Sequence, residues 1–252
     1  MPADYVMMGS AFENTNGTDI KLKDINFGAE FAGPEWDEDS SVWNKIAPQI
    51  QLEFWDHEGT TWYYYLDGAV DDGNGGYKAG WVDENGDEPE EDPVIMPGLG
   101  FWFRDYYNKN REFNNCGQVV PDSPWQRTFN VDYRMLVCPF PIDVSLKDIN
   151  FINLEKNMPE WDEDGDFKKT ATQVQVPFRT HEGFQSFFYV DHGVEDPKNP
   201  GEYIAGWVNE DGDTPEDSDL VIPAGRGAWF RPLVGGDPMT VEFYINGKPK
   251  AE

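Results

Sequence analysis

The chain has 252 residues, and 48 acidic side chains against 19 Lys and Arg give it a formal net charge of −29. Such a charge repels phosphate backbones and anionic lipid headgroups, so nucleic acids and acidic membrane surfaces are poor candidate partners. Aromatic residues make up 15% of the chain, which argues against disorder, and no apolar run approaches the ~20 residues of a membrane-spanning helix.

Short β-rich runs separated by Gly, Pro, Asn and Asp follow one another along the whole chain. In the first half they predict strands at residues 5–10, 20–22, 49–55, 61–66, 77–82, 94–95, 100–104 and 111–120. In the second half they predict strands at residues 127–137, 173–179, 185–190, 203–208, 220–222, 227–231 and 240–245. The only helical turn expected is the KDI segment, at residues 23–25 and 147–149. This pattern predicts an all-β fold of antiparallel β-sandwich or barrel-like domains.

The chain repeats itself. The segment from Lys23 to Arg104 returns from Lys147 to Arg231, with the strings KDINF, PEWDED, HEG, AGWV and WFR in the same order. The shift of roughly 125 residues is the size of a domain rather than of a solenoid repeat. We therefore expect two tandem homologous domains, residues 1–120 and 121–252. Large rings that recur in both copies are expected to pack in the cores: Trp36 with Trp161, Trp81 with Trp207, and Trp102 with Trp229.

One asymmetry between the copies concerns the edge of a sheet. The strand-like run QRTFNV, residues 126–131, precedes Asp132, whereas only three residues precede the matching Asp4. Either the first domain has a shorter sheet, or it has an open edge to which residues 240–250 of another molecule, or a separate partner, add as a strand. The second interpretation predicts a homo-oligomer or polymer.

Three acidic turns are candidate calcium sites. Each places side-chain oxygens at alternate positions around a Gly, which is how a short loop collects ligands for Ca²⁺. None matches the EF-hand template, so hydrated hairpin loops are the alternative. The candidate ligands are Asp83, Asn85 and Asp87, then Asp162, Asp164 and Asp166, and then Asp211 and Asp213.

The run Trp62-Tyr63-Tyr64-Tyr65 puts aromatic rings on both faces of one predicted strand, because alternate residues of a strand point to opposite faces. One face can belong to the core. We expect the other, with Trp62 and Tyr64, to stack on sugar rings or to bury against a neighbouring subunit. Packing of these rings beneath a loop of the same chain is the alternative.

Cys116 and Cys138 are the only cysteines, and they flank the junction of the two copies. A disulfide between them would close a loop worth about 3 kcal/mol and would favour an exported protein. Two free thiols are the alternative. The first residues, MPADYVMMGSAF, lack the basic end and apolar stretch of a secretory signal. Either the protein stays inside the cell, or the sequence starts at a processed end.

Enzymatic constellations are weak. The PEWDED carboxylates, within residues 35–39 and 160–164, are spaced as in some glycoside hydrolases, but a catalytic pair is rarely duplicated intact. The two HEG turns have no Cys or His at zinc-ligand spacing. No phosphate-binding loop, nucleophile elbow or Cys-His pairing is present, so the sequence predicts no enzyme.

The order of the turn motifs in the second copy adds a resemblance. The motifs are VCPFP at residues 137–141, KDI at 147–149, GWVN at 206–209 and IPAGRGAWF at 222–230. They resemble uncharacterised β-rich repeats of exported surface proteins of Gram-negative bacteria, with a GNPFP-like turn and an IPAGQGFW-like motif. The first copy departs at residues 9–12, where the prolines are missing. The resemblance implies an extracellular or cell-surface location and a structural or adhesive role, and it carries over no catalytic residue.

These observations together predict a non-enzymatic extracellular structural protein. It would assemble with itself, as a filament, surface layer or adhesin building block, through β edges and aromatic contacts. The alternative is a carbohydrate-binding module that uses Trp62 and Tyr64.

Overall fold

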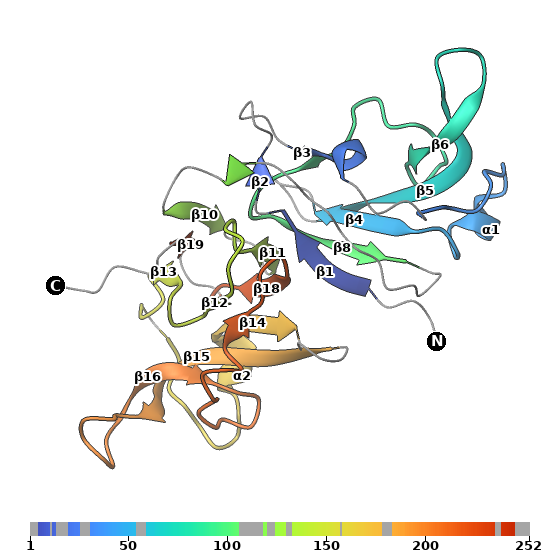
Figure 1. The fold of residues 1–252 in the computed structure, drawn as a ribbon. Coiled ribbons are helices and arrows are strands. Elements are labelled where there is room, and N and C mark those ends of the chain that lie inside the picture. Colours follow the sequence, from blue (N-terminus) through green and yellow to red (C-terminus); the bar gives the residue numbers. More distant parts are fainter. Residues whose placement is uncertain are drawn as a thin grey trace. The chain divides into compact units, whose positions relative to one another are not determined.

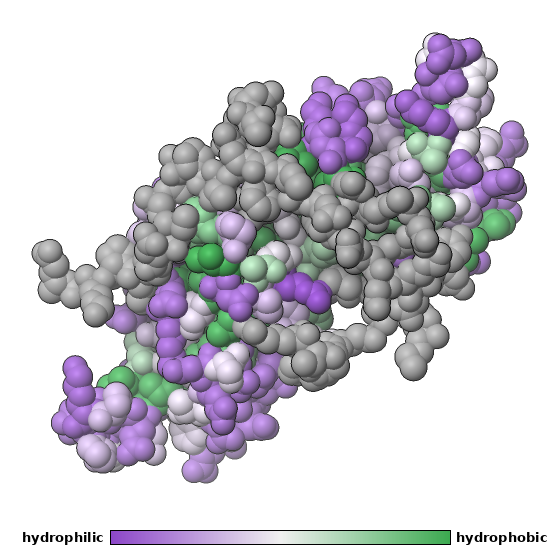
Figure 2. All heavy atoms as spheres, viewed as in Figure 1, coloured by the Kyte–Doolittle hydropathy of each residue, from purple (hydrophilic) through white to green (hydrophobic). Residues whose placement is uncertain are grey.

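The computed structural model of the chain describes residues 5–10, 12–13, 20–25, 31–53, 59–105, 118–119, 124–129, 133–156, 158–177, 183–234 and 238–244. Antiparallel strands dominate these residues (Figure 1), which confirms the predicted all-β fold. Figure 2 shows hydrophilic side chains over much of the described part of one face. No helix among the described residues is long and apolar enough to cross a membrane. Contacts within the chain divide it into two compact units, Met1–Val119 and Val120–Glu252.

The first unit is built on a five-stranded antiparallel sheet with the order β1-β8-β4-β5-β6. Two small sheets, β2-β9 and β3-β7, complete its described strands. Its elements are β1 (Tyr5–Gly9), β2 (Phe12–Glu13), β3 (Ile20–Lys21), η1 (Leu22–Asp24), α1 (Ser40–Trp43), β4 (Gln49–Glu53), β5 (Thr60–Asp71), β6 (Tyr77–Val82), β7 (Val94–Ile95), β8 (Gly100–Arg104) and β9 (Gln118–Val119).

The second unit has a five-stranded sheet of equivalent order, β11-β18-β14-β15-β16. It also has a three-stranded sheet, β10-β19-β13, and the pair β12-β17. Its elements are β10 (Trp125–Phe129), β11 (Arg134–Val137), β12 (Val144–Ser145), β13 (Asn150–Ile152), α2 (Phe167–Thr170), β14 (Thr172–Pro177), β15 (Phe184–Glu195), β16 (Tyr203–Val208), β17 (Val221–Ile222), β18 (Gly227–Arg231) and β19 (Met239–Phe243).

Apolar side chains cover both faces of the large sheet in the first unit. On one face Ile50 and Phe103 pack against Leu22 of η1. On the other face Tyr64 and Leu66 pack against Trp43 of α1. Burial on both faces explains why β5 carries rings at successive positions, since each face needs its own core.

The second unit is layered in the same way. Phe151 of β13 lies 5.4 Å, between ring centroids, from Trp207 of the large sheet. On the opposite face Phe167 of α2 lies 5.6 Å from Phe188 in an edge-to-face arrangement. The described strands therefore form stacked open layers, as in a β-sandwich, and not the closed barrel that was the other form expected.

The longest strands exceed their predicted lengths. β5 and β15 each run for 12 residues, and each contains a bulge, between Leu66 and Val70 and between Val190 and Val194. Positive φ angles at Gly68 (66°) and His192 (55°) mark the bulges. In a sequence, a DG or DHG string predicts the end of a strand. In β5 and β15, however, strand pairing resumes beyond this string.

Two other predictions about strands need correction. The predicted strand 127–137 is two strands, β10 and β11, which pair with β19 and β18 respectively. Residues 240–243 cannot donate a strand to another molecule, because β19 already pairs with β10 on one side and β13 on the other. Residues 1–4 and 245–250, which the open-edge hypothesis also needs, lie outside the described residues.

Candidate binding grooves

The acidic turn that follows β6 is closed by its own first carboxylate. Oδ1 of Asp83 accepts hydrogen bonds from the backbone N–H groups of Asn85 (2.8 Å) and Asp87 (3.0 Å). The matching turn of the second unit begins at Asn209, whose Oδ1 accepts from the N–H groups two and four residues further on, at 2.9 Å each. An amide oxygen replaces a carboxylate without loss of these bonds, which explains why Asn and Asp are interchangeable here.

The third acidic turn precedes α2. Asp162 accepts hydrogen bonds from the backbone N–H groups of Asp166 (2.9 Å) and Phe167 (3.1 Å). The bond from Asp166 is the main reason why the pKa of Asp162 lies below its ordinary value. This carboxylate therefore starts the helix by binding amides that the first turn leaves without partners.

The structure does not bring the predicted calcium ligands together. Among the described residues no group of three or more His, Cys, Asp or Glu side chains could hold a metal ion. Calcium binding stays a prediction. The predicted ligands lie in three separate turns: Asp83, Asn85 and Asp87; Asp162, Asp164 and Asp166; Asp211 and Asp213.

The loops that contain the PEWDED strings form hydrogen bonds both to the acidic turns after β6 and β16 and to the bulges in β5 and β15. In the first unit the backbone N–H of Trp36 donates to the carbonyl of Asp67 in the bulge at 2.9 Å, and its indole Nε1 donates to the carbonyl of Gly86 at 3.1 Å. In the second unit Trp161 makes the same two bonds, to Asp191 and Gly212. The Trp36 and Trp161 residues are 42% and 37% exposed, so they anchor loops instead of filling the cores, whereas Trp81 and Trp207 are buried as predicted.

The prediction that Tyr64 is exposed beside Trp62 is wrong. Tyr64 is only 5% exposed. Its ring meets Trp43 edge-on at 5.0 Å, and its hydroxyl oxygen accepts a hydrogen bond from the side-chain amide of Gln49 at 3.2 Å. Trp62 is 37% exposed and donates its indole N–H to Oγ1 of Thr60. On this face of β5, α1 covers Tyr64 but leaves Trp62 exposed. The two rings therefore do not form the surface expected to bind sugars.

Cys138 is a buried free thiol in the structure. Burial raises its pKa from 9.0 to about 11. Its predicted disulfide partner Cys116 lies outside the described residues, so the disulfide stays a prediction.

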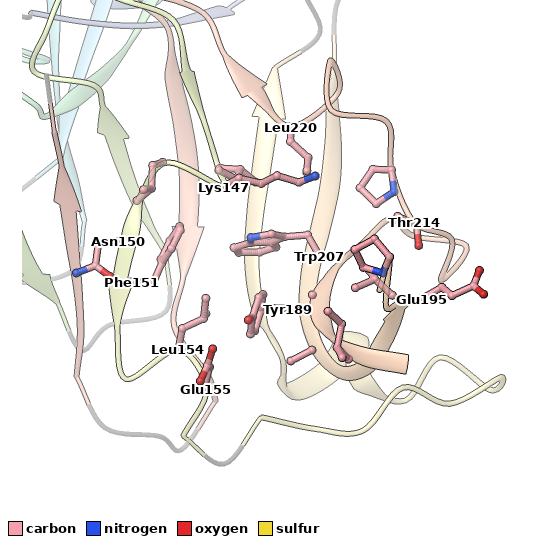
Figure 3. A pocket seen from close by; sticks show the side chains of 18 of the residues that line it. Lys147, Asn150, Phe151, Leu154, Glu155, Tyr189, Glu195, Trp207, Thr214 and Leu220 are labelled. Atoms are coloured by element: carbon pink, nitrogen blue, oxygen red, sulfur yellow. The ribbon is translucent and has the colours of Figure 1, made fainter. Parts of the chain in front are cut away.

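A groove of about 950 Å³ lies on the large sheet of the second unit. Phe151, Tyr189 and Trp207 line it together with Lys147 and Glu155 (Figure 3). The ring of Trp207 has neighbours on two sides, because Tyr189 meets it edge-on at 5.3 Å and Phe151 at 5.4 Å.

The first unit has an equivalent groove of about 710 Å³. Its ring pair repeats the geometry, since Tyr65 meets Trp81 at 5.3 Å and 68° where Tyr189 meets Trp207 at 5.3 Å and 69°. The other lining residues at matching sequence positions are Lys23 and Lys147, Ile25 and Ile149, Ala79 and Ala205.

The tyrosine hydroxyls lie in a negative field. Burial and then the charges of Glu155 and Asp191 raise the pKa of Tyr189, and burial and then Asp67 raise that of Tyr65. These hydroxyls therefore stay neutral, and they can donate or accept hydrogen bonds. Lys147 forms an exposed ion pair with Asp217.

The two grooves differ in charge. In the second unit Ile204 occupies the position of Lys78, and Thr214 occupies the position of Glu88. The second groove is therefore more apolar along β16 than the first groove is along the equivalent strand, β6. Sequence reasoning identified Trp81 and Trp207 as core residues but missed the grooves. The available signal was that Tyr65 and Tyr189 recur beside them in the repeat.

Comparisons with protein families, with curated proteins and with solved structures found no match for this chain.

Proposed function

We propose that this is a non-enzymatic surface protein that acts outside the cell and binds its partner through the two equivalent grooves. The observation that carries the proposal is the recurrence of one groove, with the same Tyr–Trp pair, in both units. Two copies of a binding site in one chain raise the avidity for a partner with repeated features by 10²-fold or more, on the order of magnitude seen for linked sites. A reaction centre gains nothing comparable from duplication.

The proposed location and role also have support from the sequence. The resemblance to exported surface repeats favours an extracellular, structural or adhesive protein. The net charge of −29 favours a soluble chain that does not associate with anionic surfaces. Carbohydrate remains a candidate ligand through the grooves, but no longer through Trp62 and Tyr64 acting together.

Filling the grooves tests the proposal. Ala79 and Ala205 line the two grooves at matching positions, so Ala79→Trp and Ala205→Trp should block one groove each. Val42→Trp and Val234→Trp are matched controls, because these valines are exposed and line neither groove. The proteins are compared on arrays of glycans and of synthetic peptides.

We expect the wild-type chain to bind array positions that carry repeated ligands. Each single groove variant should lose apparent affinity on the order of a hundredfold through lost avidity, and the double variant should not bind. The controls should bind like the wild type. Array signals that survive in the double variant would contradict the proposal.

Self-assembly is the second candidate function. β6 and β16 each end their five-stranded sheet, and each carries a Tyr on its first residue, Tyr77 (74% exposed) and Tyr203 (56% exposed). Exposed strand edges with apolar side chains favour pairing with another chain. Light scattering of the wild type and of the Tyr77→Lys, Tyr203→Lys double variant tests this. A monomer at high concentration in both proteins would remove the candidate.

A further inference from the structure

The groove of the second unit lies beside a strand edge. β16 pairs with β15 on one side and is the last strand of its sheet in the described order. Ile204, Ala205 and Gly206 of the same strand line the groove, and Leu146 and Leu220 line it from other segments of the unit. An extended peptide laid along β16 would therefore have a strand edge for its backbone and a groove for its side chains.

The groove also offers apolar contact. Ile204 is 43% exposed on β16, and Leu154 and Val194 line the same space. Alternate side chains of an added strand point to the same face. A peptide with an apolar residue at every second position would bury those side chains in the groove.

Two carboxylates and two ammonium groups line this groove. They belong to Glu155, Glu195, Lys147 and Lys156, and Lys147 also pairs with Asp217 outside the lining. Oε1 of Glu195 accepts a hydrogen bond from the backbone N–H of Gly201 at 2.8 Å.

Glu155 supplies one of the two carboxylates of the lining. It is exposed, it lies close enough to Tyr189 to act on that hydroxyl, and Figure 3 shows both side chains in the groove. A carboxylate, a hydroxyl oxygen and the half-buried ring of Tyr189 suit an ammonium or guanidinium group. The net charge of −29 on the chain would attract such a partner from a distance.

We infer that the second groove binds an extended basic segment of a partner polypeptide, added to β16 as a further strand, with a Lys or Arg side chain beside Glu155 and Tyr189. This inference rests on the proposed function, which makes the groove a binding site, and it names the class of partner. The first groove differs in having Lys78 where Ile204 stands, so it should bind such a segment less well.

Synthetic peptides test the inference by titration calorimetry on the full chain. The probes are acetylated, amidated heptapeptides that alternate Leu with Lys, with Glu or with Ser. The variants are Glu155→Gln, which removes the carboxylate, and Ala205→Trp, which fills the groove. Glu163→Gln is the matched control, because Glu163 is exposed and lies outside the groove.

We expect the Lys peptide to bind the wild type more tightly than the Ser peptide, and the Glu peptide not to bind. Glu155→Gln should weaken the Lys peptide about fivefold, as expected for an exposed ion pair, and should leave the Ser peptide unchanged. Ala205→Trp should abolish binding of both peptides to the second groove and leave only the weaker binding of the first, and Glu163→Gln should change neither peptide's binding.

Two further Lys peptides test strand addition, one N-methylated at its odd residues and the other at its even residues. Only alternate residues of an added strand bond to the edge, so one peptide should lose binding and the other should keep it. Equal binding of the two would overturn strand addition. Equal binding of the Lys and Ser peptides, unaffected by Glu155→Gln, would overturn the basic partner and leave the groove a binding site. Peptide binding that Ala205→Trp leaves unchanged would overturn the proposed function itself.

Discussion

The indole N–H of Trp161 donates a 3.2 Å hydrogen bond to the carbonyl oxygen of Gly212, 51 residues further along the chain. Gly212 has a φ of 83°, and a Cβ on it would lie 2.6 Å from Nε1 of Trp161. The PEWDED loop thereby holds the acidic turn at a residue that must be Gly, for its backbone angle and for the space above it. The same relationship joins Trp36 to Gly86 in the first unit.

Gly212→Ala should destabilise the second unit by about 2–3 kcal/mol. About 1–2 kcal/mol comes from a left-handed backbone at a residue with a Cβ, and the rest from displacing the Trp161 indole. Chemical denaturation measures the change. Gly201→Ala is the control, because Gly201 has a φ of 88° but no atom lies within 4 Å of the added Cβ. Equal losses in the two variants would show that the contact with Trp161 is not tight.

Trp161→Phe should cost about 1 kcal/mol of unfolding free energy, because it removes the hydrogen bond to the Gly212 carbonyl. The hydrogen exchange rate of the amides in the turn should rise at the same time. Trp62→Phe serves as the comparison, since its indole N–H bonds only locally, to Thr60. A change as large in Trp62→Phe would mean that the ring, and not the N–H to Gly212, is responsible.

Tyr64→Ala should destabilise the first unit by about 3–5 kcal/mol, the cost of removing a large buried ring. Tyr64 packs against Trp43 in the core. Trp62→Ala, two residues earlier and on the exposed part of β5, should cost less than about 1 kcal/mol. Thermal or urea unfolding of the two variants measures the difference. Similar losses would contradict the placement of the two rings.

The sequence predicted most of the strands because their turns carry Gly, Asn and Asp at positions that tolerate few other residues. The strands 77–82, 100–104, 203–208 and 227–231 appear with their predicted bounds. The bulges in β5 and β15 were missed because a local string such as DG signals a turn. Whether pairing resumes after such a string depends on the neighbouring strand, which sequence reasoning could not position.

The candidate site was harder to predict than the fold. Aromatic alternation on β5 was read correctly as two faces, but the element that covers each face follows from distant packing. Tyr64 is covered by α1, a four-residue helix too short to leave a periodic signal. Conversely, Tyr65 and Trp81 belong to one groove only because β5 and β6 pair in a register that places them opposite each other.

The Cys138 thiol makes stability depend on pH in the alkaline range. Burial raises its pKa from 9.0 to about 11 in the folded chain, so the unfolded chain loses this proton first. Below pH 9 both states keep the proton, and the full contribution to stability is present. Between pH 9 and 11 unfolding releases a proton, and the unfolding free energy should fall by up to about 2–3 kcal/mol.

Cys138→Ala isolates this effect from the tyrosines and lysines that titrate in the same range. Without the thiol the unfolding free energy should fall less steeply between pH 9 and 11, although the variant is slightly less stable at pH 8 because of the smaller side chain.

Iodoacetamide labelling without reductant provides the complementary measurement. The thiol should react only after unfolding, because the thiolate is the nucleophile. Failure to react even in the unfolded chain would show that the sulfur is held in a disulfide and that no thiol titrates.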